Sequence, residues 1–282
     1  MSIVKTVRML LKIVLSAFFM LQSVLLFSAT STDYQSKPPL VSQAATPQVM
    51  LAMSADHQLF YKAYTDYHDL NDDGVIDTTY NHAFDYYGYF DSGKCYSYDT
   101  TQNRFEPFSI TADKYCSGNK WAGNFLNWAS MTRIDTVRKL LFGGFRSTDS
   151  ATETVLERSY LPNDAHSFAK YYSDTAELIK LTPFNSTEAA NGITICNTTN
   201  TSTQWSQNVT DAPLIRVAKG DYALWGANER WQCRWNEEKS ASNGNNSANS
   251  GLGSASSNPI KSSVGLGEND YVARVKVCDS VL

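Results

Sequence analysis

An acidic loop near residue 70 constrains this chain more than any other stretch. Its sequence, DLNDDGVID, alternates oxygen-bearing side chains around a glycine. Calcium prefers six to eight oxygen ligands, and a loop of this pattern aims alternate residues at one point while Gly74 permits a sharp reversal. The predicted ligands are Asp69, Asn71, Asp73, the carbonyl oxygen of Val75, and Asp77. We therefore expect one bound Ca2+ that stabilises the fold and takes no part in catalysis.

The closing ligand of this loop is missing. A standard calcium loop has a bidentate carboxylate at its twelfth position, which here is Tyr80. Asp85, or a carboxylate distant in the sequence, would have to complete the ligand set. The alternative is an acidic turn that binds nothing, because Asp, Asn and Gly are also ordinary turn residues. Four aspartates within nine residues repel one another, which favours a cation between them.

Residues 1–30 have the pattern of a secretion signal. Lys5, Arg8 and Lys12 precede an apolar run at residues 13–27, and small residues follow it. An uncleaved anchor is the alternative, although the run is short for a span of roughly 20 apolar residues. No later segment is apolar enough to cross a membrane. Cleavage would remove three cationic side chains and lower the net charge from −4 to −7. So acidic a chain is expected to bind nucleic acids poorly.

The remaining chain divides by composition. Residues 31–46 are polar and proline-containing, which predicts a linker, and residues 47–282 form the predicted domain. Within that domain, residues 240–263 are nearly pure Ser, Asn, Gly and Ala, which is typical of a low-complexity loop.

Five cysteines in an exported chain predict disulfides with one cysteine left over. Cys95 and Cys116 bracket one polar excursion, and Cys196 and Cys233 bracket another, so pairing of sequence neighbours is the simplest connectivity. Sequence alone does not decide among the possible pairings. Cys278 would then remain alone close to the last residue, as expected for a product cut before its partner arrives.

Hydrophobic periodicity predicts a mixture of strands and helices, hence an α/β fold. Strands are expected at residues 48–53, 154–161, 214–218 and 271–278, and helices at 120–141 and 164–172. The pattern at 60–67 leaves strand and helix open, and residues 185–209 resemble an exposed excursion. The aromatic rings of residues 78–90 are expected in the core.

The helix expected at residues 120–141 has the broadest apolar stripe in the chain. Asn119 is placed to cap its start, and Gly143 is placed to end it. Asp135 lies at helical spacing from Arg138 and close to Arg133, which predicts an ion pair on the helix surface.

The sequence contains none of the common catalytic motifs. G-x-S-x-G, H-E-x-x-H and P-loop patterns are absent, and the four histidines lack metal-ligand spacing. We therefore predict that the chain is not an enzyme. A secreted carbohydrate-binding or hydrolytic protein that uses the aromatic side chains as a surface is the alternative.

Several long stretches resemble one family. They are QVMLAMSADHQLFYKAYTDY, DLNDDGVIDTTY, DYYGYFDSGKCY, SGNKWAGNFLNWASMTRIDTVRKLLFGG, TVLERSYLPNDAHSFAKYY, PLIRVAKGDYALWGANERWQC and YVARVKVC. In order and content they resemble the N-terminal region of PilC/PilY-type proteins, which are secreted type IV pilus biogenesis factors and tip-associated adhesins of Gram-negative bacteria. The resemblance covers most of residues 47–280.

The resemblance implies a partial von Willebrand factor A-like sheet-and-helix domain with long loop insertions. Such proteins continue into a calcium-binding β-propeller that controls pilus extension and retraction, and 282 residues are too few to contain it. An incomplete N-terminal part without the propeller is therefore expected. One departure stands out: Met53 occupies the place of the first Asp of the D-x-S-x-S metal motif, so that metal site is expected to be degenerate.

The resemblance also implies a function and a location. An exported protein that supports pilus biogenesis, twitching motility or surface attachment is expected at the periplasm, outer surface or pilus tip. Its implied partners are pilus components (minor pilins) and host or abiotic surfaces. The long predicted helix, with Thr132 and Asp135, would correspond to a helix that flanks the sheet of the von Willebrand fold.

Overall fold

The computed structural model describes residues 12, 50, 52, 54, 56–161, 166–199, 212–227, 232–236, 258–261 and 270–277. The chain divides into two compact units, residues 1–53 and 54–282, and the fold described below belongs to the second. The predicted leader and linker, apart from residue 12, lie outside the described residues, as does most of the loop at 240–263.

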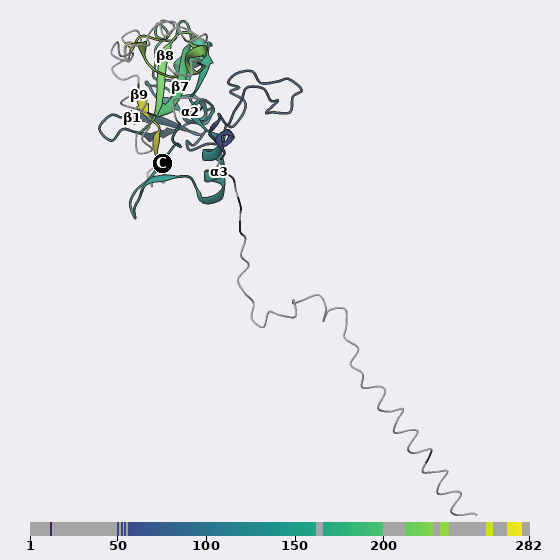
Figure 1. Cartoon of the computed structure of the whole chain (residues 1–282). Helices are drawn as coiled ribbons and strands as arrows, with labels where there is room; N and C mark the ends of the chain where they lie inside the picture. Colours follow the sequence, from purple (N-terminus) through teal and green to yellow (C-terminus); the bar gives the residue numbers. More distant parts are fainter. Residues whose placement is uncertain are drawn as a thin grey trace, which may run out of the picture. The chain divides into compact units, whose positions relative to one another are not determined.

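Two β-sheets form the framework of the second unit (Figure 1). In spatial order, the larger sheet consists of β3 (Trp121–Ala122), β1 (Lys94–Asp99), β2 (Arg104–Ile110), β10 (Arg274–Val277), β5 (Thr154–Glu157) and β4 (Arg146–Asp149). The smaller sheet consists of β6 (Phe168–Tyr172), β7 (Ile193–Thr199), β8 (Pro213–Lys219) and β9 (Asp270–Val272). The helical elements are η2 (His57–Phe60), α2 (Gly123–Ser130), α3 (Arg133–Phe142), α4 (Thr175–Leu181) and η3 (Ala223–Gly226).

The fold is mixed α/β, as predicted. Neighbouring strands run antiparallel, except that β10 meets β2 in a parallel contact at Val275 and Phe105. The described strands form neither a barrel nor a propeller. The von Willebrand factor A-like arrangement is not confirmed and stays a prediction.

The last predicted strand connects the two sheets. Its alternation is confirmed, because Tyr271, Ala273 and Val275 are all buried. Instead of one strand, however, it forms β9 in the smaller sheet and β10 in the larger one. Ala273 lies at the junction, where its N–H donates to the carbonyl of Pro213 and its carbonyl accepts from the N–H of Arg158. One short segment therefore contributes to both sheets.

The single helix predicted at residues 120–141 is wrong in its extent. Trp121 and Ala122 form β3, and the helical part is interrupted between α2 and α3. At the interruption, the carbonyl of Met131 accepts from the N–H of Ala63, and the N–H of Arg133 donates to the carbonyl of Tyr61. Backbone groups that would continue a helix are thus paired with a distant segment, because tertiary contacts outweigh local propensity.

The caps also differ from the prediction at one end. Asn119 has a left-handed backbone (φ 60°) and does not cap a helix, whereas Thr132 caps α3 by accepting from the N–H of Asp135. Gly143 ends α3 with φ 84°, as predicted.

Asp135 is buried, so its prediction as a surface ion pair is wrong. Its carboxylate has no exposed area and accepts from the hydroxyl groups of Tyr89, Thr132 and Ser159 and from the Ser159 N–H. Arg138 is only a peripheral partner, with 3.7 Å between its Nη1 and Asp135 Oδ1. The side chain therefore ties the start of α3 to the end of β5 and to residue 89.

Among the other predicted elements, the strands at 154–161 and 214–218 are confirmed as β5 and β8, the former ending at Glu157. The helix predicted at 164–172 is wrong, because Phe168–Tyr172 is the edge strand β6. The exposed excursion predicted at 185–209 holds for residues 185–187 and 190–191 but is wrong for β7, since every residue of that strand is buried. In the predicted strand at 48–53, only residues 50 and 52 are described, and both are exposed and outside any strand.

Both predicted disulfides are confirmed. The Cα atoms of Cys95 and Cys116 are 5.7 Å apart, and those of Cys196 and Cys233 are 5.5 Å apart, within the usual range for a disulfide. Cys278 lies outside the described residues.

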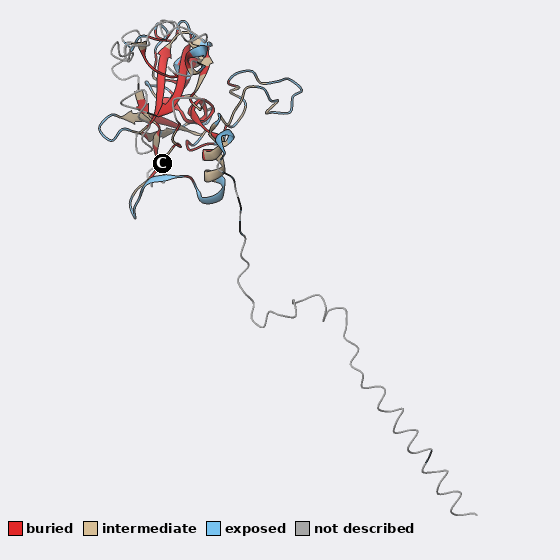
Figure 2. Ribbon diagram, viewed as in Figure 1, coloured by how far each residue is buried: buried red, intermediate tan, exposed pale blue. Residues whose placement is uncertain are grey.

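Four of the six aromatic residues of segment 78–90 enter the core, as predicted, whereas Phe84 is partly buried and Tyr87 is exposed. Tyr80, Tyr86, Tyr89 and Phe90 are each 5% exposed or less and meet neighbouring rings mainly edge to face. Figure 2 shows that burial is concentrated in the smaller sheet and in α2. No helix in the described part of the chain has the length and apolar character needed to span a membrane.

Candidate functional site

The acidic loop is closed by a β-bridge at its ends and by its own carboxylates. Asp77 donates its N–H to the carbonyl of His68 (3.0 Å), which joins the two ends. The Asp69 carboxylate accepts from the N–H groups of Asp73 (3.1 Å) and Gly74 (2.7 Å). Gly74 has φ 86°, so the reversal predicted for it is present.

The structure places the five predicted ligands in one loop, but their side chains do not point to a common centre. Both oxygens of Asp77 accept hydrogen bonds, one from the Leu70 N–H and one from the amide of Asn81. The Asn71 amide donates to Asp73 (2.9 Å). Among the residues that the structure describes, no group of three His, Cys, Asp or Glu side chains is arranged to hold a metal.

The two positions considered for a closing ligand are engaged elsewhere. Tyr80 is buried in the aromatic core, where its hydroxyl accepts from Asn124. Asp85 pairs with Lys114 at 2.8 Å. Neither side chain contributes to the loop in this structure.

A buried ion pair anchors the chain just before the loop. Lys170 of β6 is 3% exposed, and its Nζ lies 3.1 Å from Asp66 and 4.3 Å from the ring centre of Trp128. The indole N–H of Trp128 donates to the same Asp66 oxygen, and Lys62 lies 3.7 Å from the other. Burial lowers the pKa of Lys170 to about 7, although the nearby Asp66 carboxylate opposes this shift.

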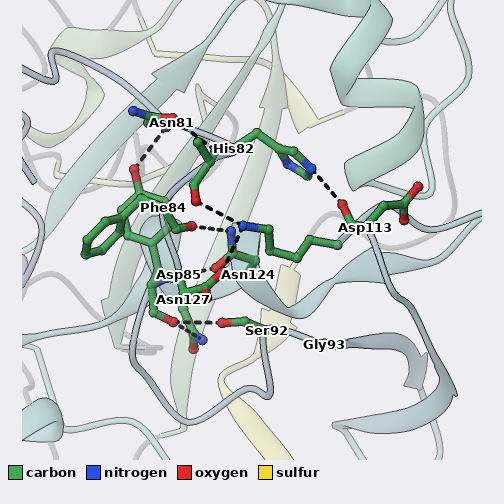
Figure 3. A network of polar contacts seen from close by, with 12 residues as sticks. Asn81, His82, Phe84, Asp85, Ser92, Gly93, Asp113, Asn124 and Asn127 are labelled. Atoms are coloured by element: carbon green, nitrogen blue, oxygen red, sulfur yellow. Dashed lines mark hydrogen bonds and ion pairs between the residues drawn. The ribbon is translucent and has the colours of Figure 1, made fainter. Parts of the chain in front are cut away.

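A second candidate site is built on residues 85–92, a segment without helix or strand (Figure 3). Two fully buried carboxamides of α2 hold it. Asn124 accepts from the N–H of Tyr86 and donates to the carbonyl of Phe84. Asn127 accepts from the N–H of Phe90 and donates to the carbonyls of Tyr86 and Phe90. The carboxamides thus pair backbone groups that would otherwise be buried without partners.

Gly88 permits this close approach. A Cβ atom there would lie 2.1 Å from Asn127 Oδ1 and 2.6 Å from Met131 Cγ, which is closer than real contacts allow. The segment therefore needs a residue without a side chain where it crosses α2.

The segment forms one wall of a pocket of about 540 Å³. Lys94 of β1, Lys139 of α3 and Lys276 of β10 line the other walls. Lys139 donates to the carbonyl of Gly88 and lies 4.6 Å from the ring centre of Tyr87, and burial lowers its pKa. The pocket thus offers a ligand ammonium groups, the carboxylates of Asp85 and Asp91, an aromatic ring and backbone carbonyls.

No sequence motif predicts this second site. The only sequence signal for it is the pair Asn124 and Asn127, two carboxamides three residues apart that lie beside Phe125 and Trp128 in an apolar stripe. Polar side chains inside an apolar stripe are buried with it and need partners.

The profile of a family described as "PilY1 homolog, small alpha/beta domain" matches residues 77–218. This is half of the chain and includes α2, α3 and the carboxamides. The chain belongs to this PilY1 homolog family. The match begins at Asp77, so most of the acidic loop precedes it.

Two curated relatives, both from Xylella fastidiosa (strain Temecula1 / ATCC 700964) and both named type IV pilus biogenesis factor PilY1 homolog, are similar to the chain. One is 44% identical over 131 residues, which is 45% of this chain and 9% of the relative. The other is 40% identical over 92 residues, which is 29% of this chain and 8% of the relative. The chain thus spans under a tenth of either relative. No solved structure matches it.

Replacing Gly88 by alanine should lower the free energy of unfolding by about 1–3 kcal/mol, because the added methyl group overlaps Asn127 and Met131. Urea unfolding followed by tryptophan fluorescence measures the loss. Gly93→Ala is the matched control, since the nearest atom to its added Cβ is 3.5 Å away. Equal stability of the two variants would contradict the packing argument.

Lys170 should make stability depend on pH. Its folded pKa of about 7 lies below the unfolded value of about 10.4, so the unfolded state binds more protons between these pH values. The free energy of unfolding should therefore rise from pH 7 to pH 9, and Lys170→Met should remove most of that rise. Lys62→Met, which alters a more exposed partner of Asp66, should keep it. If the free energy of unfolding rose equally with pH in the wild type and in Lys170→Met, the prediction would be wrong.

Proposed function

We propose that this chain is an exported protein of the type IV pilus system that supports pilus biogenesis, twitching motility or surface attachment. The family match over residues 77–218, together with relatives named type IV pilus biogenesis factors, carries the proposal. Two disulfides add support, because disulfides persist in oxidising compartments outside the cytoplasm. Its proposed partners are minor pilins and host or abiotic surfaces.

The alternative of a carbohydrate-binding or hydrolytic protein depends on an aromatic surface. Most rings of residues 78–90 are instead in the core, and Tyr87, 43% exposed, is the main exception. Within this segment only one half-exposed ring remains, which is a weak platform for stacking sugars. The structure thus favours the pilus proposal over this alternative.

Deletion of the gene should abolish or strongly reduce twitching motility, and the full chain supplied in trans should restore it. The matched control is residues 31–282 without the leader, which should stay in the cytoplasm and fail to restore motility. Normal twitching of the deletion strain would refute the proposed function. Full rescue by the leaderless chain would refute export.

We also propose that the acidic loop binds Ca2+ through Asp69, Asn71, Asp73, Asp77 and the Val75 carbonyl. Two observations support this. The β-bridge between His68 and Asp77 and the hydrogen bonds from two backbone N–H groups to the Asp69 carboxylate hold the loop backbone in a compact turn. Binding would require Asn71 and Asp73, which now bond to each other in an exposed position, to turn toward the ion. The ion would then stabilise the chain next to the Asp66 anchor.

Calcium should raise the stability of the folded chain. Extracellular modules bind Ca2+ with a Kd of roughly 10⁻⁴–10⁻³ M, so a tenfold excess over Kd stabilises by about 1.4 kcal/mol. Asp73→Asn should abolish this gain in calorimetric titration and in unfolding curves. Asp72→Asn is the control, because Asp72 is not a predicted ligand and Asn tolerates its left-handed backbone (φ 57°). Identical wild-type unfolding curves with calcium and with chelator would refute the site.

A further inference from the structure

Four large apolar side chains are exposed where α3 ends. Leu140 is 75% exposed, Leu141 45%, Phe142 56% and Phe145 44%, and we call these four residues the α3-end patch. The only residue that α3 buries fully is Asp135. Helices normally bury their apolar side chains, and an apolar cluster left in water marks an interaction surface.

An open sheet edge follows this patch directly. Phe145 leads into β4, the last strand of the larger sheet, and no strand pairs with its outer edge among the described residues. All four residues of β4 are exposed. Figure 2 colours β4 and the end of α3 as exposed, below the buried part of the fold. An open edge offers backbone N–H and C=O groups to another strand.

The sequence of β4 is complementary to itself. Its residues are Arg146, Ser147, Thr148 and Asp149. Ser147 is the extra residue of a bulge, so Arg146, Thr148 and Asp149 occupy successive positions of the ladder. If two copies pair antiparallel about an axis between their Thr148 residues, Arg146 of each copy lies opposite Asp149 of the other. Opposite charges at directly paired positions stabilise such a ladder, and like charges disfavour it.

The local geometry suits this register. A bulge between Arg146 and Thr148 brings Arg146 and Asp149 to the same side of β4, where their side chains now pair within the chain at 2.8 Å. Both side chains are about half exposed, so exchanging this bond for two equivalent bonds between copies costs little. Charges and bulges on edge strands block unspecific pairing, and this pattern leaves one register open.

We propose that β4 and the α3-end patch form an interface with a second copy of this chain. The two β4 strands pair antiparallel about a twofold axis perpendicular to the sheet. This axis carries both patches to the same face of the joined sheet, where they shield each other from water. The symmetry closes the interface, so a dimer forms and not a fibre.

Sedimentation velocity of the full chain between roughly 1 and 200 µM tests the interface, because a small contact of this kind is expected to have a micromolar Kd. The wild type should show a concentration-dependent dimer. Arg146→Asp and Asp149→Arg should each weaken it about tenfold or more, since each places like charges opposite each other. A monomeric wild type over this range would overturn the proposal.

Charge exchange tests the register. The double variant Arg146→Asp/Asp149→Arg should dimerise like the wild type, and an equimolar mixture of the two single variants should form a mixed dimer. If the double variant stays as weak as the single ones, the self-pairing is wrong. Pairing of β4 with a different strand of the second copy would give the same result, because exchanging the two charges would not restore such a contact.

A substitution within the α3-end patch tests whether the patch belongs to the interface. Phe142→Ser should weaken the dimer about tenfold and change the unfolding curve far less, because more than half of the Phe142 surface is already in water in the single chain. Ile110→Ser, at an apolar residue on β2 that is 68% exposed, is the matched control and should leave the dimer unchanged. Equal effects of the two substitutions would exclude the patch from the interface.

Discussion

Residues 61–93 depend on partners elsewhere in the chain, because they form neither a helix nor a strand. A buried backbone must still pair its N–H and C=O groups. Asn124 and Asn127 meet this requirement for residues 84–90, because each carboxamide accepts from a backbone N–H and donates to a backbone carbonyl of that segment. The helix that carries them, α2, is itself fully buried and contacts β7 through the bond from Asn197 to the carbonyl of Ala129. The irregular segment is therefore fixed by the most buried helix of the fold.

Both candidate sites depend on this arrangement. The pocket uses the segment at 85–92 as a wall, so its shape follows from the contact of Gly88 with Asn127. The acidic loop precedes that segment and is held at its start by Asp66, Lys170 and Trp128. Trp128 lies on α2, one turn after Asn124, so a single helix positions the chain on either side of the loop. The loop itself is largely exposed, and its carboxylates bond mainly to groups of the loop and of the residues just after it.

Buried charges connect the remaining elements. Asp135 joins α3 to Ser159 and Tyr89, and Arg158 beside it donates to Asn197, Thr198 and Leu214 of the smaller sheet. Burial lowers the pKa of Arg158 to about 10, while the negative charges of Asp135 and Glu157 oppose the shift. Removing one partner from such a network leaves a buried charge uncompensated, which is more damaging than losing an exposed pair. The larger and the smaller sheet are thus connected through polar groups as well as through Ala273.

The sequence by itself determined the features that depend on neighbours along the chain. These are the helix end at Gly143, the alternating burial of residues 271–275, and the compact acidic turn. The two disulfides match the simplest of the pairings that the sequence left open. Tertiary structure decided the rest. The predicted long helix breaks because residues 61–63 pair with its backbone. The strand β7 is buried in spite of its polar sequence because strands lie on both sides of it and α2 and η3 pack against it. Asp135 and the two asparagines are buried because distant backbone groups complete their hydrogen bonds, and no local pattern contains those partners.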